Sequence, residues 1–173
     1  IRSNLDITLI NDIENADLVG IADTTAIGNG LDNKLFGNMA DNILDGAGGV
    51  DILTGGQGAD TFVISNNGDG IAADTITDFN SGEDLIVVDL ASFGIDPEAL
   101  GLLSSGLVSA DSFVSGAGAR ALDANDYFIF DTAQGLLLFD SDGSGEGEAV
   151  LIAEIDMEKE DRIINAGDVF VGI

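Results

Sequence analysis

Four consecutive rows of nine residues decide the fold of this chain: Gly28-Asn-Gly-Leu-Asp-Asn-Lys-Leu-Phe36, Gly37-Asn-Met-Ala-Asp-Asn-Ile-Leu-Asp45, Gly46-Ala-Gly-Gly-Val-Asp-Ile-Leu-Thr54 and Gly55-Gly-Gln-Gly-Ala-Asp-Thr-Phe-Val63. Each row opens with Gly, has Asn or Asp at its sixth place and has a large apolar residue at its eighth place. The sixth places are Asn33, Asn42, Asp51 and Asp60, and the eighth places are Leu35, Leu44, Leu53 and Phe62. A fixed period is the sequence signature of a repeat architecture, so the rows predict a stacked structure.

The composition of a row predicts a tight loop followed by a short strand. Glycine permits the positive φ angles of tight turns, and such turns expose carbonyl oxygens. We expect the last three residues of each row to be extended, with the eighth-place side chain turned inward. If one row makes half of a coil, loops on the same side recur every two rows. This spacing predicts Asn33, Asp51 and Asp69 along one edge of the stack, and Asn42, Asp60 and Asp78 along the other.

Loops stacked in this way offer the ligands that calcium prefers. Neighbouring strands lie about 4.8 Å apart, close enough for successive loops to share a cation. Calcium takes oxygens from carboxylates and carbonyls in a tolerant geometry, whereas magnesium demands a stricter octahedron. We therefore expect several Ca²⁺ ions. The predicted ligands are Asn33, Asn42, Gly46, Gly48, Asp51, Gly55, Gln57, Asp60, Asp69, Asp74 and Asp78.

Two alternatives to these metal sites stay open. The Asn rows lack ligand charge, so a metal-free β-solenoid is an alternative for them, and Asp74 and Asp78 have the alternative of being ordinary turn aspartates. A flexible Gly-rich linker is disfavoured, because linkers have no apolar residue at a fixed place in every row.

Charge and composition narrow the function classes. The 173 residues carry a net charge of −27, from 24 Asp and eight Glu against five basic residues. Such a charge disfavours nucleic acid or an anionic membrane as a partner. The 45% content of hydrophobic residues is too high for a disordered acidic tail. Together these values are typical of a chain that folds once cations neutralise it.

Missing residue types weaken an enzymatic interpretation. The chain has no Cys and no His, which excludes disulfides, thiolate metal sites and the usual general base. Carboxylate pairs such as Asp140 and Asp142 can in principle perform acid–base chemistry, but they lie in Gly-rich loops. No apolar run has the length of a transmembrane helix. Because the chain begins at Ile1 rather than Met, we expect it to be a segment of a longer polypeptide.

Three regions are expected: residues 1–27 as irregular leading coils, residues 28–90 as the calcium-binding repeats, and residues 91–173 as a β-rich C-terminal cap. Within the cap, residues 127–130 and 135–139 predict a hairpin. The loop after it places Asp140, Asp142 and Ser144 at the spacing of an EF-hand. Leu151 stands at the twelfth place, where an EF-hand has Glu, so this loop either holds a weaker calcium ion or is an acidic turn.

The rows from Gly28 to Val63 resemble the repeats-in-toxin (RTX, hemolysin-type) calcium-binding family. Gly58-Ala-Asp-Thr-Phe62, Asp74-Thr-Ile-Thr-Asp-Phe79, Gly82-Glu-Asp84 and the end Asp168-Val-Phe-Val171 resemble the C-terminal domain of serralysin-type proteases. The resemblance implies an all-β fold, a parallel β-roll with calcium ions between stacked turns and a β-rich cap. It also implies export to the extracellular space by a type I secretion machinery that reads an uncleaved C-terminal signal.

Two functions follow as hypotheses. The first is a calcium-dependent folding and type I secretion module at the C-terminus of a larger secreted protein, with any catalytic domain upstream of it. The alternative is a calcium-stabilised recognition module of an adhesin, an S-layer protein or a carbohydrate-active enzyme, which contacts a polysaccharide or a cell surface. An exposed row of aromatic or basic residues would favour the alternative, but the basic residues are scattered along the chain.

Overall fold

The computed structural model describes residues 1–66, 73–98, 100, 106–144, 149–157 and 163–172. The described chain is nearly all β, as predicted, with two short 3₁₀ helices at Ala110–Ser112 and Ala166–Asp168. Its strands are β1 (Arg2–Ser3), β2 (Ile7–Thr8), β3 (Asn15–Leu18), β4 (Thr25–Asn29), β5 (Lys34–Phe36), β6 (Ile43–Ala47), β7 (Ile52–Thr54), β8 (Thr61–Ile64), β9 (Asp74–Ile76), β10 (Leu85–Val88), β11 (Phe113–Gly116), β12 (Phe128–Asp131), β13 (Leu136–Phe139), β14 (Val150–Ile155) and β15 (Val169–Val171).

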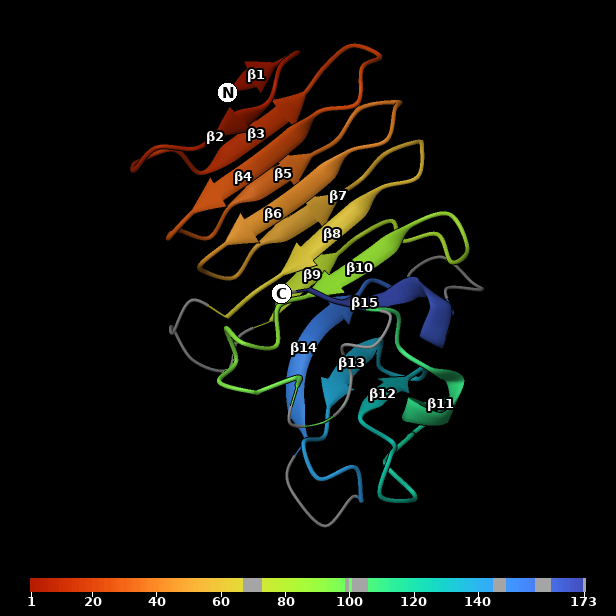
Figure 1. The fold of residues 1–173 in the computed structure, drawn as a ribbon. Coiled ribbons are helices and arrows are strands. Elements are labelled where there is room, and N and C mark those ends of the chain that lie inside the picture. Colours follow the sequence, from red (N-terminus) through yellow and green to blue (C-terminus); the bar gives the residue numbers. More distant parts are fainter. Residues whose placement is uncertain (67–72, 99, 101–105, 145–148, 158–162, 173) are drawn as a thin grey trace.

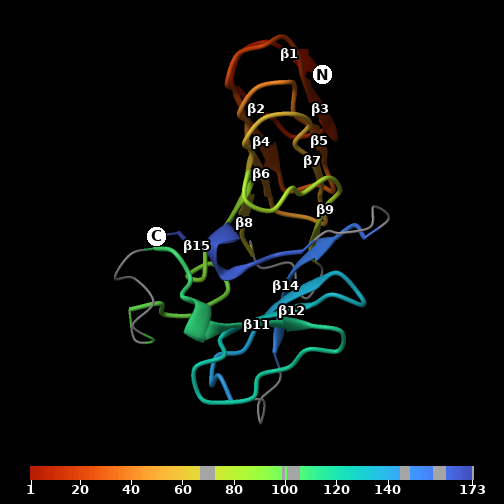
Figure 2. The same cartoon turned by 90° about the vertical axis from the view of Figure 1, so that its right-hand side faces the viewer.

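These strands form two sheets (Figure 1). Sheet A has the order β1-β3-β5-β7-β9-β14-β13-β12-β11, and sheet B has the order β15-β10-β8-β6-β4-β2. From β1 to β10 the chain therefore changes sheet after every strand. Figure 2 shows the consequence, because the odd-numbered strands lie on one side of the upper half and the even-numbered strands on the other. Neighbouring strands of this part pair in parallel, an arrangement compatible with the predicted β-roll.

The register of the rows agrees with a repeat of two rows. Lys34 in β5 lies beside Ile52 in β7, eighteen residues later, and Ile43 in β6 lies beside Thr61 in β8 with the same separation. The separation then grows. Ile52 lies beside Thr75, and Thr61 lies beside Leu85, which are separations of 23 and 24 residues. The period predicted from the four rows thus ends at β8.

The eighth-place side chains form the core between the two sheets, as predicted. Leu35, Leu44, Leu53 and Phe62 are all 0% exposed. Phe62 also packs against the ring of Phe79, with 6.2 Å between the ring centroids. Burial of a large apolar side chain stabilises a fold by about 1.5–3 kcal/mol. The continuous stack of these side chains therefore stabilises the packing of the two sheets against each other.

The leading residues are more regular than expected. Residues 1–27 contain β1 to β3 and the start of β4, and β3 and β4 pair in parallel with β5 and β6. Ala16, Leu18 and Ala26 turn inward and are buried. Alternation of small or apolar residues with polar ones is sufficient to continue both sheets ahead of the first row.

The C-terminal part is joined to both sheets. β12 and β13 form the predicted antiparallel hairpin, and β14 lies between β13 and β9, so that the cap extends sheet A. β15 pairs in parallel with β10, with Val169 beside Ile86, and becomes the outermost strand of sheet B. Within the described part of the chain, no helix combines the length and the apolar character that a membrane crossing requires.

Candidate metal centre

The sixth-place side chains are buried although they are polar. Asn33, Asn42, Asp51 and Asp60 each stand directly before a strand, and their exposed fractions are 1%, 1%, 0% and 2%. A buried carboxylate is costly unless hydrogen bonds or a cation compensate it. The partners of these four side chains therefore decide what the loops can bind.

Hydrogen bonds connect the sixth-place residues into two ladders. In the first ladder, the Asn33 N–H donates to Asp51 Oδ1 (2.7 Å), and the Asp51 N–H donates to Asp74 Oδ1 (2.9 Å). Each carboxylate in this ladder thus accepts a bond from the backbone of the preceding loop. The structure therefore brings together Asn33, Asp51 and Asp74.

The second ladder lies at the opposite edge of the strands. The Asn42 N–H donates to Asp60 Oδ1 (2.8 Å), and the Asp60 N–H donates to Asp84 Oδ1 (2.9 Å). The structure thus brings together Asn42, Asp60 and Asp84.

The two ladders correct the predicted edges. We predicted Asp78 eighteen residues after Asp60, but Asp84 occupies that position because the connection to β10 is six residues longer than two rows. Asp78 does lie at the predicted edge, beside the loop of Asp60, where it accepts bonds from the N–H groups of Gly55 and Gly56 (2.8 Å each). Asp74 continues the first ladder, where we predicted Asp69. Asp69 itself lies outside the described residues.

The first-place glycines are required by close backbone contacts. A Cβ atom at Gly28 would clash with the carbonyl oxygen of Gly46, and a Cβ atom at Gly46 would clash with Asp51 Oδ2. The second edge repeats this arrangement, with Gly55 against Asp60 Oδ2. The carboxylate oxygen therefore points at the first-place glycine of its own loop.

The remaining predicted loop ligands, Gly48 and Gln57, stand at the third places. The Gly48 N–H donates to the carbonyl oxygen of Asn29 (2.9 Å), and the Gln57 N–H donates to that of Asn38 (3.1 Å). These bonds hold each loop against the loop two rows earlier, which lies at the same edge of the stack.

One atom of the first ladder lacks a partner. In the described ranges, Asp51 Oδ2 is the single buried side-chain oxygen or nitrogen without a hydrogen bond. Burial raises the pKa of Asp51 from 3.8 to about 8, against the lowering effect of the Asn33 N–H, and the nearby Asp74 raises it further. A carboxylate in this position is stable either protonated or beside a cation.

The other ladder carboxylates share this environment. Burial raises the pKa of Asp60 to about 6 and that of Asp74 to about 6, and in each case backbone N–H groups oppose the shift. Burial also raises the pKa of Asp84. The set of buried carboxylates and loop carbonyls matches the oxygen ligands of calcium. Among the described residues no group of three or more Asp, Glu, His or Cys side chains converges on one point, so a cation here would need backbone carbonyl oxygens as ligands.

No protein-family model matches this chain, and no curated protein matches it either. The resemblance to the RTX family therefore rests on the residues of the rows themselves.

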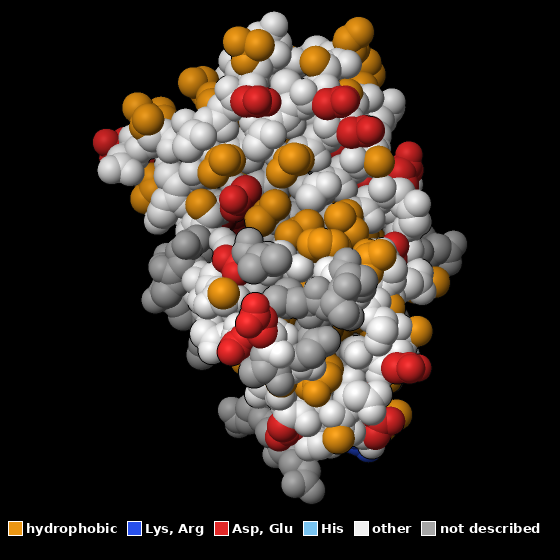
Figure 3. Space-filling model, viewed as in Figure 1, with side chains coloured by type: hydrophobic (Ala, Val, Ile, Leu, Met, Phe, Trp, Pro, Cys, Tyr) orange, Lys and Arg blue, Asp and Glu red, His pale blue; other side chains and the backbone are white. Residues whose placement is uncertain are grey.

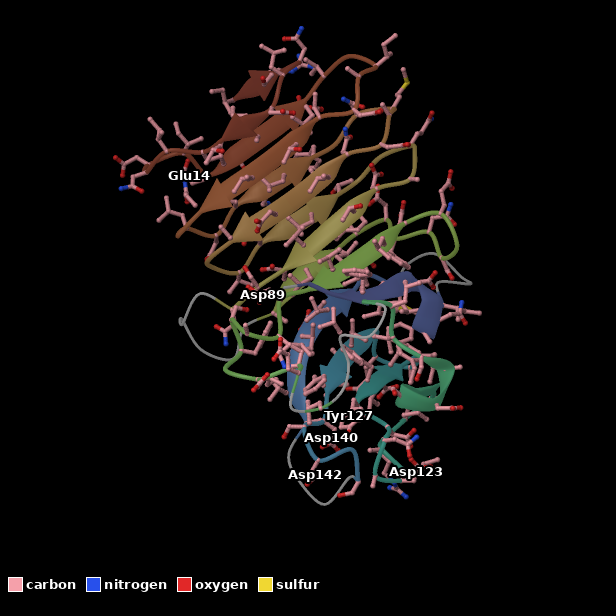
Figure 4. All side chains as sticks on the ribbon, in the orientation of Figure 1. Glu14, Asp89, Asp123, Tyr127, Asp140 and Asp142 are labelled. Carbon is pink, nitrogen blue, oxygen red and sulfur yellow. The ribbon has the colours of Figure 1, made fainter. Side chains whose placement is uncertain are left out.

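The predicted site at Asp140 and Asp142 is separate from the ladders. Figure 4 shows both residues at the opposite end of the molecule from β1 to β8. Asp140 Oδ1 accepts bonds from the N–H groups of Asp142 (3.1 Å) and Gly143 (3.2 Å), and Asp142 Oδ1 accepts bonds from the N–H (2.9 Å) and the Oγ–H (2.6 Å) of Ser144. All four of these bonds lie within residues 140–144, the loop that begins at the end of β13.

Two aspartates of the second edge were not among the predicted ligands. Asp84 stands directly before the apolar strand β10, as each sixth-place residue stands before its strand, and this signal is present in the sequence. Asp168 lies beside the same edge, where it accepts bonds from Ser81 Oγ–H (2.6 Å) and the Gly82 N–H (3.0 Å). A contact across more than eighty residues has no signal in the local sequence.

Proposed function

We propose that this chain is a calcium-dependent folding module of the RTX type, built as a parallel β-roll whose stacked loops bind calcium. The observation that carries the proposal is the buried, unpartnered Oδ2 of Asp51 within a ladder of carboxylates. Without a cation, this atom has lost water and gained no hydrogen bond, a condition that costs about 1–3 kcal/mol or more for a charged group.

The chain's own residues divide the task of holding the ion. Asp51 and Asp60 supply buried carboxylates, each of which lies against the first-place glycine of its own loop, and the carbonyl oxygens of Gly46 and Gly55 face the loops that begin at Gly28 and Gly37. The backbone bonds from Asn33 and Asn42 fix one oxygen of each carboxylate and leave the second oxygen to turn toward the loop. Bound calcium would supply positive charge and a bridge between these oxygens.

The net charge of −27 also favours a fold that needs bound cations. Acidic side chains are spread over the face shown in Figure 3, with almost no Lys or Arg between them. Such self-repulsion opposes the compact state. An ion that binds the folded chain but not the unfolded chain adds RT ln(1 + [Ca²⁺]/Kd) to stability, about 1.4 kcal/mol per site at ten times Kd. Binding energy then becomes folding energy.

Calcium dependence also suits a protein that leaves the cell. Extracellular calcium modules have dissociation constants of about 10⁻⁴–10⁻³ M, far above cytosolic calcium, so the chain would stay unfolded until it is exported. We propose type I secretion on the resemblance of the segment Asp168-Val-Phe-Val171 to the end of RTX proteins. Removal of residues 163–173 should abolish export in cells that carry such a machinery. Continued export of the shortened chain would contradict this part of the proposal.

A calcium titration followed by far-UV circular dichroism tests the folding function. We expect a disordered spectrum in chelator and a cooperative gain of β signal with calcium, but no such gain with magnesium. Asp60→Ala should require more calcium than Asn33→Ala, because it removes a charged ligand. A spectrum that is the same in chelator and in calcium would refute the proposal.

The alternative, a recognition module, lacks a specific observation. Among the described residues, Phe36 is the one aromatic residue in the set of exposed large hydrophobic side chains, so no aromatic row is present there. Arg2 is already paired with Asp17 (2.9 Å).

A further inference from the structure

The loops of the four rows differ at their second place. This place holds Asn29 and Asn38 in the first two rows, and Ala47 and Gly56 in the last two. Ala47 has a φ angle of 64° and Gly56 a φ angle of 104°, both in the left-handed region, whereas neither Asn has a positive φ. The backbone N–H of the second place therefore points in different directions in the two kinds of loop.

In the Asn rows, this N–H closes the loop. The Asn29 N–H donates to Asn33 Oδ1 (2.8 Å), and the Asn38 N–H donates to Asn42 Oδ1 (2.7 Å). Each sixth-place oxygen that points toward its own loop is thus already satisfied without a cation.

The loop before β10 shows that closure does not depend on the type of the sixth-place residue. There the Asn80 N–H donates to Asp84 Oδ2 (2.8 Å), although the acceptor is a carboxylate. An Asn four residues before the acceptor is the feature common to all three closed loops.

The side chains of the second-place Asn residues also occupy carbonyl oxygens of the preceding loop. Asn29 Nδ2 donates to the carbonyl oxygens of Ile10 (2.9 Å) and Ile13 (2.8 Å). Asn38 Nδ2 donates to the carbonyl oxygen of Ala22 (3.0 Å). These carbonyl oxygens would otherwise face a cation between the loops, but here each accepts a hydrogen bond from a side-chain amide.

The last two rows lack both features. The Ala47 N–H donates to Asp45 Oδ1 (2.9 Å) and the Gly56 N–H donates to Asp78 Oδ2 (2.8 Å), so neither reaches the sixth-place carboxylate of its own loop. Neither side chain carries an amide group. In the first of these rows, the carboxylate oxygen that faces its own loop is Asp51 Oδ2, the atom that is buried without a partner.

We propose that the second-place residue determines which loops bind a cation. Asn closes a loop with its backbone and side-chain amides, whereas Ala47 and Gly56 leave the loop open, so that calcium is confined to the loops 46–51 and 55–60. This inference rests on the proposed function, because it assigns the same calcium ions to particular loops.

Calcium stoichiometry, measured by native mass spectrometry and by isothermal titration, tests the assignment. Ala47→Asn places in the third row the residue that closes the first row, and Ala47→Gly is the matched control that keeps the left-handed backbone accessible. We expect Ala47→Asn to lose about one calcium ion per molecule, and Ala47→Gly to bind as many ions as the unchanged protein.

The reverse exchange keeps the test independent of any folding defect in Ala47→Asn. The double variant Asn38→Gly/Asn42→Asp gives the second row the open-loop pattern, and it should gain about one calcium ion. Ala47→Asn with full stoichiometry, or the double variant without a gain, would overturn the assignment. If the unchanged protein binds no calcium at all, the proposed function itself fails, so the two failures are distinguishable.

Discussion

Asp51→Asn is expected to stabilise the calcium-free protein and to weaken its response to calcium. Burial raises the pKa of Asp51 from 3.8 to about 8 in the folded chain. At about pH 7.5 the unfolded chain carries a carboxylate at this position, whereas the folded chain must protonate it. This pH is about 3.7 units above the pKa of 3.8 of the unfolded carboxylate, and each unit is worth about 1.4 kcal/mol. Protonating Asp51 on folding therefore costs the calcium-free fold about 5 kcal/mol. This cost is comparable to the whole stability of a domain, about 5–15 kcal/mol.

The sign of the pH dependence follows from the direction of the shift. A group with a raised pKa binds more protons in the folded chain than in the unfolded chain, so it favours folding at low pH. The contribution of Asp51 is complete below about pH 4 and is lost as the pH rises through about 8. Asn does not titrate, so Asp51→Asn should remove this part of the pH dependence. The same variant lacks a charged ligand, and calcium should stabilise it less than the unchanged protein.

Thermal unfolding followed by circular dichroism, between about pH 4.5 and about pH 8.5, measures both effects. The samples are the unchanged protein, Asp51→Asn and Asp111→Asn, each in chelator and in calcium. Asp111 is exposed, so its variant controls for the loss of one negative charge. In chelator we expect the unchanged protein to lose its folded β signal as the pH rises, until its spectrum is disordered near neutral pH, and Asp51→Asn to keep that signal to a higher pH. The reasoning is refuted if Asp51→Asn behaves as Asp111→Asn does, or if calcium-free stability rises with pH.

Three further predictions concern packing and closure. Phe62→Ala should cost about 3–5 kcal/mol in denaturant unfolding with calcium present, because its ring is fully buried; a loss below about 1 kcal/mol would contradict the described core. Gly28→Ala should destabilise the protein in the same assay, since its Cβ would meet a neighbouring carbonyl, whereas Gly30→Ala, with open space around it, should be nearly neutral; equal effects would show that the loops are not in close contact. Asp168→Ala removes the acceptor of the Gly82 N–H and should increase hydrogen exchange in β10 and β15, and unchanged protection there would argue against the described closure.

The sequence by itself determined the alternation of loops and strands in the rows. Leu35, Leu44, Leu53 and Phe62 recur at one place, and all four are buried in the structure because that place faces inward in every strand. Local chemistry is sufficient here, since a nine-residue period with glycine turns permits few other ways to bury one apolar side chain per row. The all-β class, the parallel pairing and the two-row register of the rows were predictable for this reason.

Only the tertiary structure decided which aspartates continue the ladders. Asp84 rather than Asp78 follows Asp60 in the ladder, because the connection to β10 contains extra residues and Leu85 is the residue that pairs with Thr61. The local sequence of the connection does not indicate which residue forms this pair. The position of Asp168 beside Ser81 depends on the pairing of β15 with β10, which joins segments far apart in the chain. The unpartnered oxygen of Asp51 depends on the direction of one N–H group in its loop. These features follow from how the packed strands place distant backbone groups, and a repeat pattern carries no information about them.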